Sequence, residues 1–333
     1  MPVLDGSTWS YTFFPKTHAV HRLPNELKSR IVHFCDMPTL VGLLHDADWK
    51  DFIDIELTLS LLKVLAKITD RPTSFRQMMR LTQSIITGST ALHYILRQPS
   101  QWQPSDTILV VPVHHFQTAM TFITELSGAH VIFDSADEAA GPYLPLTKGY
   151  TRLVQVQTLH GTIAAMQSNS RSPFSPLPSY WGTHVMNALT SDTFVCPYPK
   201  LTYHHQALVR YRHNHPNIRP LEHKYQAPGF AVFTSTRGLA DLSVSCHHFS
   251  ACSRRDRYFG DDETLTVPIR DATYNPAEWA EPDAEFTTAW RLGGRACGNR
   301  WCFLHCSSAS STVRLLRPDG YLVGGSNTTA VIG

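Results

Sequence analysis

The sequence predicts an α+β protein with helices first, a mixed sheet with flanking helices next, and a β-rich extension last. Residues 1–80 carry apolar side chains at helical spacing, and residues 81–202 alternate between strand-like and helix-like stretches. Residues 203–333 are rich in Pro, His and Arg and contain only short β-like pieces. These three ranges are the expected divisions of the chain, whose 333 residues are about two domains' worth.

The first helix is expected to begin near Leu23. Pro24 suits the first turn of a helix, and Glu26 suits the positive end of the helix dipole. Leu27 and Ile31 then lie on one face, because residues four apart are neighbours on a helix.

The other expected elements follow from hydrophobic periodicity and from runs of β-branched residues. Helices are predicted over residues 55–68, 75–81, 116–126 and 180–189. Strands are predicted over residues 106–113, 129–133, 152–157, 162–167, 264–269 and 313–316. The strands 152–157 and 162–167 are expected to pair through a turn at residues 160–161.

Residues 84–112 contain the most informative motif of the chain. A strand runs into a turn at Gly88 and Ser89, a helix follows, and a second strand opens at Asp106. A Gly-Ser turn before a helix favours phosphate, because backbone N–H groups are free there and the helix dipole is positive. Acids at i and i+2 on a strand share one face and can hold Mg²⁺. The position two residues after Asp106 is Ile108, and the strand 162–167 has no acid.

This layout resembles the nucleotidyltransferase superfamily, whose pattern is a Gly-Ser turn, a spacer and an acid-hydrophobic-acid strand. The spacer here, residues 90–105, is longer than usual. The resemblance implies that Gly88 and Ser89 contact the phosphates of a nucleotide and that Asp106 holds at most one Mg²⁺ ion. With Ile108 in place of the second acid, we expect a pseudoenzyme, a non-catalytic binding module. One alternative is an active metal-dependent nucleotidyltransferase that uses Asp106 with acids from elsewhere, such as Asp134, Asp137 or Glu138. The other is an unrelated fold, with a plain Gly-Ser turn before a core helix and Asp106 at the start of a strand.

A closer resemblance is to a group of uncharacterised fungal proteins, mostly from mushroom-forming species. It is carried by residues 88–93 (GSTALH), 102–106 (WQPSD) and 196–202 (CPYPKLT), in that order. Where those proteins often read Asp-Leu-Asp-Leu, residues 106–109 read DTIL. The resemblance covers residues 84–202 well and the remainder loosely.

The N-terminal helices resemble an F-box, the helical motif that docks substrate receptors onto the adaptor of cullin-type ubiquitin ligases. The residues that carry the resemblance, and that would bind the adaptor, are Leu23, Pro24, Leu27 and Ile31. The pattern also opens many ordinary helices, so a helical cap packed on the domain behind it is the other interpretation.

Seven cysteines and no apparent export signal indicate a reducing compartment, and the expected location is cytoplasmic or nuclear. Two Cys/His clusters near residues 246–252 and 297–306 contain enough soft ligands for zinc. Their spacing favours buried free thiols. The alternative is a zinc site held by Cys246, Cys252, Cys297 and Cys302.

The net charge of +2 gives no electrostatic case for nucleic acid, so nucleic acid is not an expected partner. No apolar run is long enough to span a membrane, so no membrane partner is expected either. A protein partner and a bound nucleotide remain as the expected classes of ligand.

Overall fold

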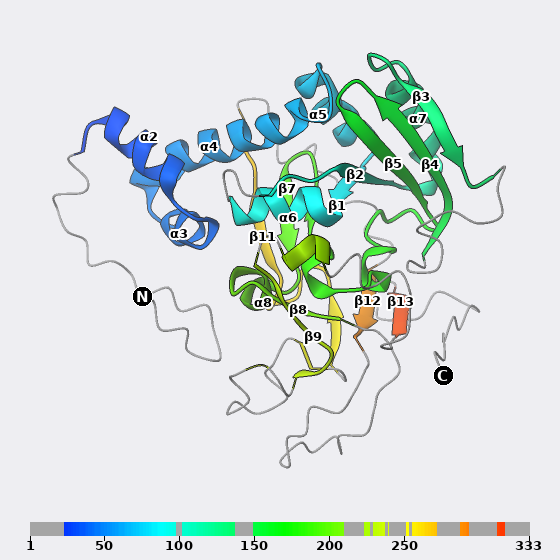
Figure 1. The fold of residues 1–333 in the computed structure, drawn as a ribbon. Helices are drawn as coiled ribbons and strands as arrows, with labels where there is room; N and C mark the ends of the chain where they lie inside the picture. Colours follow the sequence, from blue (N-terminus) through cyan, green and yellow to red (C-terminus); the bar gives the residue numbers. More distant parts are fainter. Residues whose placement is uncertain are drawn as a thin grey trace, which may run out of the picture.

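A mixed sheet dominates the structure, and helices cover one of its faces (Figure 1). The computed structural model describes residues 23–97, 102–136, 149–209, 223–226, 229–236, 239, 251–252, 255–271, 287–292 and 312–316. The fold is α+β, as the sequence predicts.

The large sheet has eight strands in the order β11-β7-β6-β1-β2-β5-β4-β3. Strands β2 and β5 pair in parallel, and the other neighbours in this sheet are antiparallel. Its strands in chain order are β1 (Ile85–Thr87), β2 (Asp106–Val111), β3 (His130–Asp134), β4 (Tyr150–Thr158), β5 (Gly161–Ser168), β6 (Ala188–Leu189), β7 (Thr193–Cys196) and β11 (Leu265–Pro268).

Smaller sheets belong to the C-terminal part of the chain. One consists of β10 (Asp256–Tyr258), β12 (Thr287–Arg291) and β13 (Thr312–Leu316). The other pairs β8 (Gln206–Leu208) with β9 (Ala231–Phe233) in parallel. Because β11 joins the edge of the large sheet, part of the 203–333 range shares a core with residues near the N-terminus.

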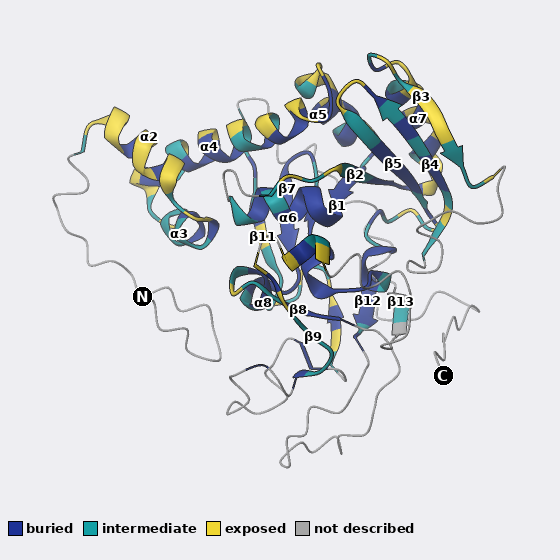
Figure 2. Ribbon diagram, viewed as in Figure 1, coloured by how far each residue is buried: buried dark blue, intermediate teal, exposed yellow. Residues whose placement is uncertain are grey.

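The α-helices of the described chain are α2 (Asn25–Phe34), α3 (Met37–Leu43), α4 (Ala47–Ala66), α5 (Pro72–Leu81), α6 (Gly88–Leu96), α7 (Phe116–Thr124) and α8 (Pro199–Tyr203). Short 3₁₀ turns lie at η1 (Val113–His115), η2 (Leu177–Ser179) and η3 (Thr183–Val185). One apolar core joins α4, α5, α6 and α7 to the sheet, and Figure 2 shows it as a buried band between helices and strands. We call this side of the sheet the helical face.

The opposite face of the sheet has its own apolar cluster. Ile85, Val110 and Met166 are buried there, and Leu177 from η2 packs over them. Strand residues alternate between the two faces, so Leu109 lies on the helical face and Val110 on the opposite one. This alternation decides which side chains meet at the candidate site.

The structure confirms the predicted 160–161 turn, since β4 and β5 form an antiparallel pair that ends at Thr158 and Gly161. The predicted 55–68 helix begins earlier, at Ala47. The Asp46 carboxylate accepts a hydrogen bond from the Asp48 backbone N–H at 3.0 Å and caps the helix.

The predicted helix at 180–189 is wrong. The chain there forms η3 and the two-residue strand β6, and Leu189 pairs with Ile86 of β1. Nearly every residue of this stretch is buried. A short buried apolar run does not distinguish helix from strand by its periodicity, and here pairing with β1 decides the outcome.

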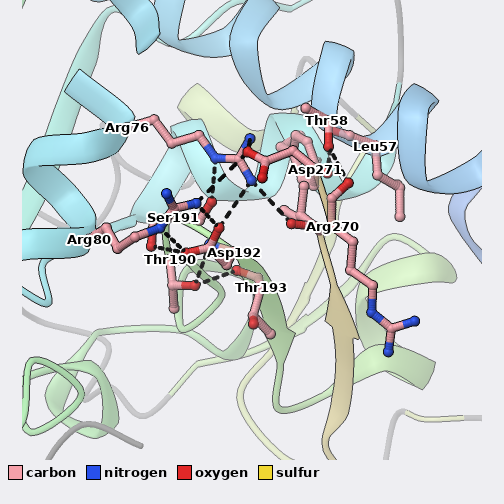
Figure 3. A network of polar contacts seen from close by, with 12 residues as sticks. Leu57, Thr58, Arg76, Arg80, Thr190, Ser191, Asp192, Thr193, Arg270 and Asp271 are labelled. Carbon is pink, nitrogen blue, oxygen red and sulfur yellow. Dashed lines mark hydrogen bonds and ion pairs between the residues drawn. The ribbon is translucent and has the colours of Figure 1, made fainter. Parts of the chain in front are cut away.

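A buried ion network fixes α5 to the sheet (Figure 3). Arg76 donates from Nε to the Ser191 carbonyl at 2.7 Å and from Nη2 to Asp192 Oδ1 at 3.1 Å. Its Nη1 lies 2.6 Å from Asp271 Oδ2, and Arg80 Nε donates to Asp192 Oδ2 at 2.9 Å. Burial opposes the charge of Asp192, but hydrogen bonds from Arg80 and Ser191 and the charges of both arginines hold its pKa below the usual value.

A second buried arginine, Arg257 of β10, ties the extension to the sheet. Its Nη2 donates to the Pro197 carbonyl at 2.8 Å, and its guanidinium lies 4.9 Å from the ring centre of Tyr198. Asp261 pairs with it and compensates the buried charge.

The Asp192→Asn variant should be strongly destabilised. Asparagine keeps the size of the side chain but removes the fully buried negative charge, which leaves Arg76 and Arg80 with Asp271 as their remaining counter-charge. Removing one partner of a buried pair costs about 3–5 kcal/mol. The measurement is the midpoint of urea-induced unfolding. Asp256→Asn, which breaks the exposed pair with Arg291, is the control and should cost less than about 1 kcal/mol.

The same variant reports the pH dependence of the network. Because the folded-state pKa of Asp192 is lowered, its stabilisation is present above the unfolded pKa of about 3.9 and is lost as pH falls through the folded value. The difference in unfolding free energy between wild type and variant should therefore narrow on acidification below about pH 4. A difference that stays constant would contradict this role.

Candidate functional site

The Gly-Ser turn lies where β1 meets α6. Gly88 has φ of +70°, a left-handed conformation that favours glycine. Thr87, the residue before the helix, does not cap it, because its hydroxyl donates to the Asn187 carbonyl at 2.7 Å. Ser89 follows in the first turn of α6 and is buried.

Ile108 fills the space over this turn. It lies opposite Thr87 in the β1–β2 register, and its side chain packs with the apolar cluster on the face opposite the helices. A Cβ placed on Gly88 would lie 3.2 Å from Ile108 Cδ1. A hydrocarbon side chain therefore stands against the turn, at the position where the resemblance would place a second metal-binding acid.

Asp106 opens β2, as predicted, and its carboxylate has a basic partner. Lys224 Nζ lies 2.8 Å from Asp106 Oδ1, and the Ser105 hydroxyl donates to the same oxygen at 2.9 Å. The ammonium group supplies the positive charge that a metal ion would otherwise bring. Sequence reasoning missed Lys224, which is 118 residues away along the chain and carries no motif.

The neighbouring strand supplies no further acid. In the parallel pair of β2 and β5, Asp106 lies opposite Thr162, and Ile108 lies opposite Ala164. Asp134 is on β3, three strands from β2, and a hydrogen bond from Arg152 holds its pKa below the usual value. Asp137 and Glu138 lie outside the described residues.

These residues do not fit a magnesium-bound triphosphate. Two metal ions need a set of carboxylates, and this face offers one carboxylate that is already paired with Lys224. Within the described ranges, no three His, Cys, Asp or Glu residues come together in a way that could hold a metal ion.

The structure describes one member of the possible zinc site. Cys252 is buried, whereas Cys246, Cys297 and Cys302 lie outside the described residues.

Of the predicted partner-binding residues, Leu27 and Ile31 lie on α2, and Leu23 and Pro24 precede it. Leu27 is 44% exposed, Ile31 40% and Phe34 80%, and Figure 2 shows much of the helix as exposed. We call these three residues the α2 face. Pro24 precedes the helix and is exposed, while Leu23 is half-buried against the core.

The opposite side of α2 is fixed to α4. Val32 is buried in the main core, and the Lys28 ammonium lies 6.0 Å from the ring centre of Trp49 and 5.7 Å from that of Phe52. The exposed face therefore belongs to a helix whose other side is packed, not to a frayed terminus.

Arg97 joins this helix to α6. Its guanidinium donates to Glu56 Oε1 at 2.7 Å and to the His33 carbonyl at 3.1 Å. Burial opposes the charge of Glu56, but its hydrogen bonds from Arg97 and His33 outweigh this and lower its pKa. The Gly-Ser turn and the α2 face thus lie toward opposite ends of α6.

No protein-family model, curated protein or solved structure matches the chain. Among the helices of the described residues, none combines the length and the apolar character needed to cross a bilayer.

Gly88→Ala should cost more stability than Gly260→Ala. Both glycines have positive φ, and a left-handed alanine costs about 1–2 kcal/mol. A Cβ on Gly260 has no atom within 4 Å, whereas one on Gly88 meets Ile108. Thermal unfolding of the two variants measures the difference.

The double variant Gly88→Ala/Ile108→Val tests whether contact with Ile108 causes the lost stability. Shortening Ile108 should restore part of the stability lost in Gly88→Ala, and the restored part is the coupling energy between the two residues. If Gly88→Ala and Gly260→Ala lose equal stability, and Ile108→Val recovers none of the stability lost in Gly88→Ala, then Ile108 does not crowd the turn.

Proposed function

We propose that the chain is a non-catalytic binding module that docks a protein partner through the α2 face. The observation that supports it is the exposure of three large apolar side chains, Leu27, Ile31 and Phe34, on a helix whose other side is packed. Their spacing of i, i+4 and i+7 is that of an amphipathic helix presented to an apolar groove.

The candidate partner is the adaptor of cullin-type ubiquitin ligases, because the residues from Leu23 to Ile31 resemble an F-box. The order of the helices agrees with this proposal. The short helices α2 and α3 come first, Asp36 caps α3 by accepting from the Thr39 backbone N–H at 2.9 Å, and the long α4 follows. In this proposal the sheet and the C-terminal extension present a substrate for ubiquitination, and the protein acts in the cytoplasm or nucleus.

The sheet is proposed to be nucleotidyltransferase-like without catalysis. Support comes from the order of β1, the Gly88 turn, α6 and β2, and from the parallel pairing of β2 with β5. In this proposal the sheet binds no metal ion for two reasons. Apolar residues, Ile108 and Ala164, stand where further acids would be needed, and Lys224 is paired with Asp106.

Purified adaptor should bind the wild-type chain and not the Ile31→Asp/Phe34→Asp variant. Both side chains are exposed, so the variant should fold while placing two carboxylates in an apolar interface. Co-purification or isothermal titration measures the binding.

The matched control is Leu81→Asp, which changes a 68% exposed leucine on α5 and should leave binding unchanged. Adaptor that fails to bind the wild-type chain would refute this choice of partner. If Leu81→Asp loses adaptor binding to the same extent, the α2 face is not the surface that contacts the adaptor.

Nucleoside triphosphates should give no Mg²⁺-dependent shift in the thermal unfolding of the wild-type chain. A ligand present at about 100 times its dissociation constant would add about 2.7 kcal/mol of stability, which is a visible shift. A shift that requires Mg²⁺ and disappears in Asp106→Asn would contradict the non-catalytic assignment and lead to transferase assays.

A further inference from the structure

A pocket opens on the helical face of the sheet, at the beginning of β2 and β5. It lies between the C-terminal end of α4, which contributes Lys67, and the first turns of α6, which contribute Thr90 and His93. The rest of its polar lining comes from the beginning of β2 and β5 and from the β4–β5 turn: Ser105, Asp106, Thr107, His160 and Thr162. The hollow is small, with a volume of about 40 Å³, and it is open to solvent.

This pocket is separate from the Gly-Ser turn. Residues of a strand alternate between faces, so Thr107 lies on the helical face with Leu109, and Ile108 lies on the opposite one. Neither Gly88 nor Ser89 lines the pocket.

The pocket has a positive charge that no acid of the described residues balances. The Lys67 ammonium forms no ion pair with a described carboxylate. Asp106 is the acidic residue of the lining, and Lys224 already compensates its carboxylate. Burial and the nearby Lys67 charge both lower the pKa of His93, which lines the same pocket.

One hydroxyl in the lining is available to donate to a ligand. Thr90 donates to the Asp106 carbonyl at 3.2 Å, and Thr162 donates to Gln157 Oε1 at 3.0 Å. Thr107 Oγ1 has Thr90 Oγ1 at 3.4 Å, near the limit of a hydrogen bond. Its hydrogen can therefore turn to an acceptor in the pocket.

We propose that this pocket binds the oxyanion group of a small organic ligand, a phosphate or a carboxylate, with Lys67 as the counter-charge and Thr107 as a hydrogen-bond donor. Val64, Ile68 and Ile163 line the rest of the pocket and provide contact for an apolar part of the ligand. A single positive charge beside apolar walls suits one anionic group better than a polyphosphate.

Equilibrium dialysis of the full chain with labelled inorganic phosphate, and separately with labelled acetate, tests the proposal at constant ionic strength. We expect saturable binding of at least one anion, and the anion that binds identifies phosphate or carboxylate as the ligand group. Lys67→Met should weaken binding about tenfold or more, because a charged hydrogen bond is lost. Thr107→Val should weaken it less.

Lys63→Met is the matched control, since Lys63 lies one turn earlier on α4 and does not line the pocket; it should bind as wild type. No saturable binding of either anion by the wild-type chain would overturn the proposal. An equal loss of anion binding in Lys63→Met and Lys67→Met would overturn it too. Binding that depends on Ser89, tested with Ser89→Ala, and is unaffected by Lys67→Met would place the anion at the start of α6 instead and would also overturn it. Unchanged thermal unfolding of Lys67→Met confirms that its loss of binding is not a loss of fold.

Discussion

The buried charges of Arg76, Arg80, Asp192 and Asp271 hold together segments that are far apart in the sequence (Figure 3). They connect α5 to the turn between β6 and β7 and to the end of β11, so the N-terminal helices, the middle of the chain and the extension meet at one place. Hydrophobic contact alone does not define the position of α5 relative to the sheet, because it is non-directional. The guanidinium groups fix their positions by hydrogen bonds of defined direction, and the cost of burying the charges is offset because both signs are present.

Local patterns in the sequence predicted the elements whose partners are near in the chain. The β4–β5 pair and the helix that places Leu27 and Ile31 on one face are of this kind, since hydrophobic periodicity reports them directly. The sequence predicted neither β6, whose strand depends on pairing with β1, nor Lys224, whose charge meets Asp106 across 118 residues. Both depend on tertiary contacts that leave no periodic signal. The position of Ile108 was readable as a missing acid, but its contact with Gly88 required the register of β1 and β2.

The two faces of the sheet differ in character. On the face of Ile108, an apolar cluster covers the surface beside the Gly-Ser turn, and Lys224 compensates the Asp106 carboxylate. On the helical face, a small pocket that Lys67 lines together with apolar side chains lies beside the same strands. The α2 face belongs to a third region, held by Arg97 beyond the end of α6. The two proposed binding sites, the pocket on the helical face and the α2 face, are therefore both separate from the Gly-Ser turn that the sequence motif indicates.

The order of the strands also constrains how the chain folds during synthesis. Thr58 of α4 donates to the carbonyl of Arg270, and Arg76 donates to that of Ile269, contacts that span about two hundred residues. Arg76 and Arg80 can meet Asp192 earlier, but the contacts of α4 and α5 with Ile269, Arg270 and Asp271 form only when the chain has been made as far as β11. Contacts this distant in sequence slow folding, because the entropy of closing a long loop is lost before the contact contributes any stability. Nascent chains of this protein should consequently depend on chaperones for longer than their early helices alone would suggest.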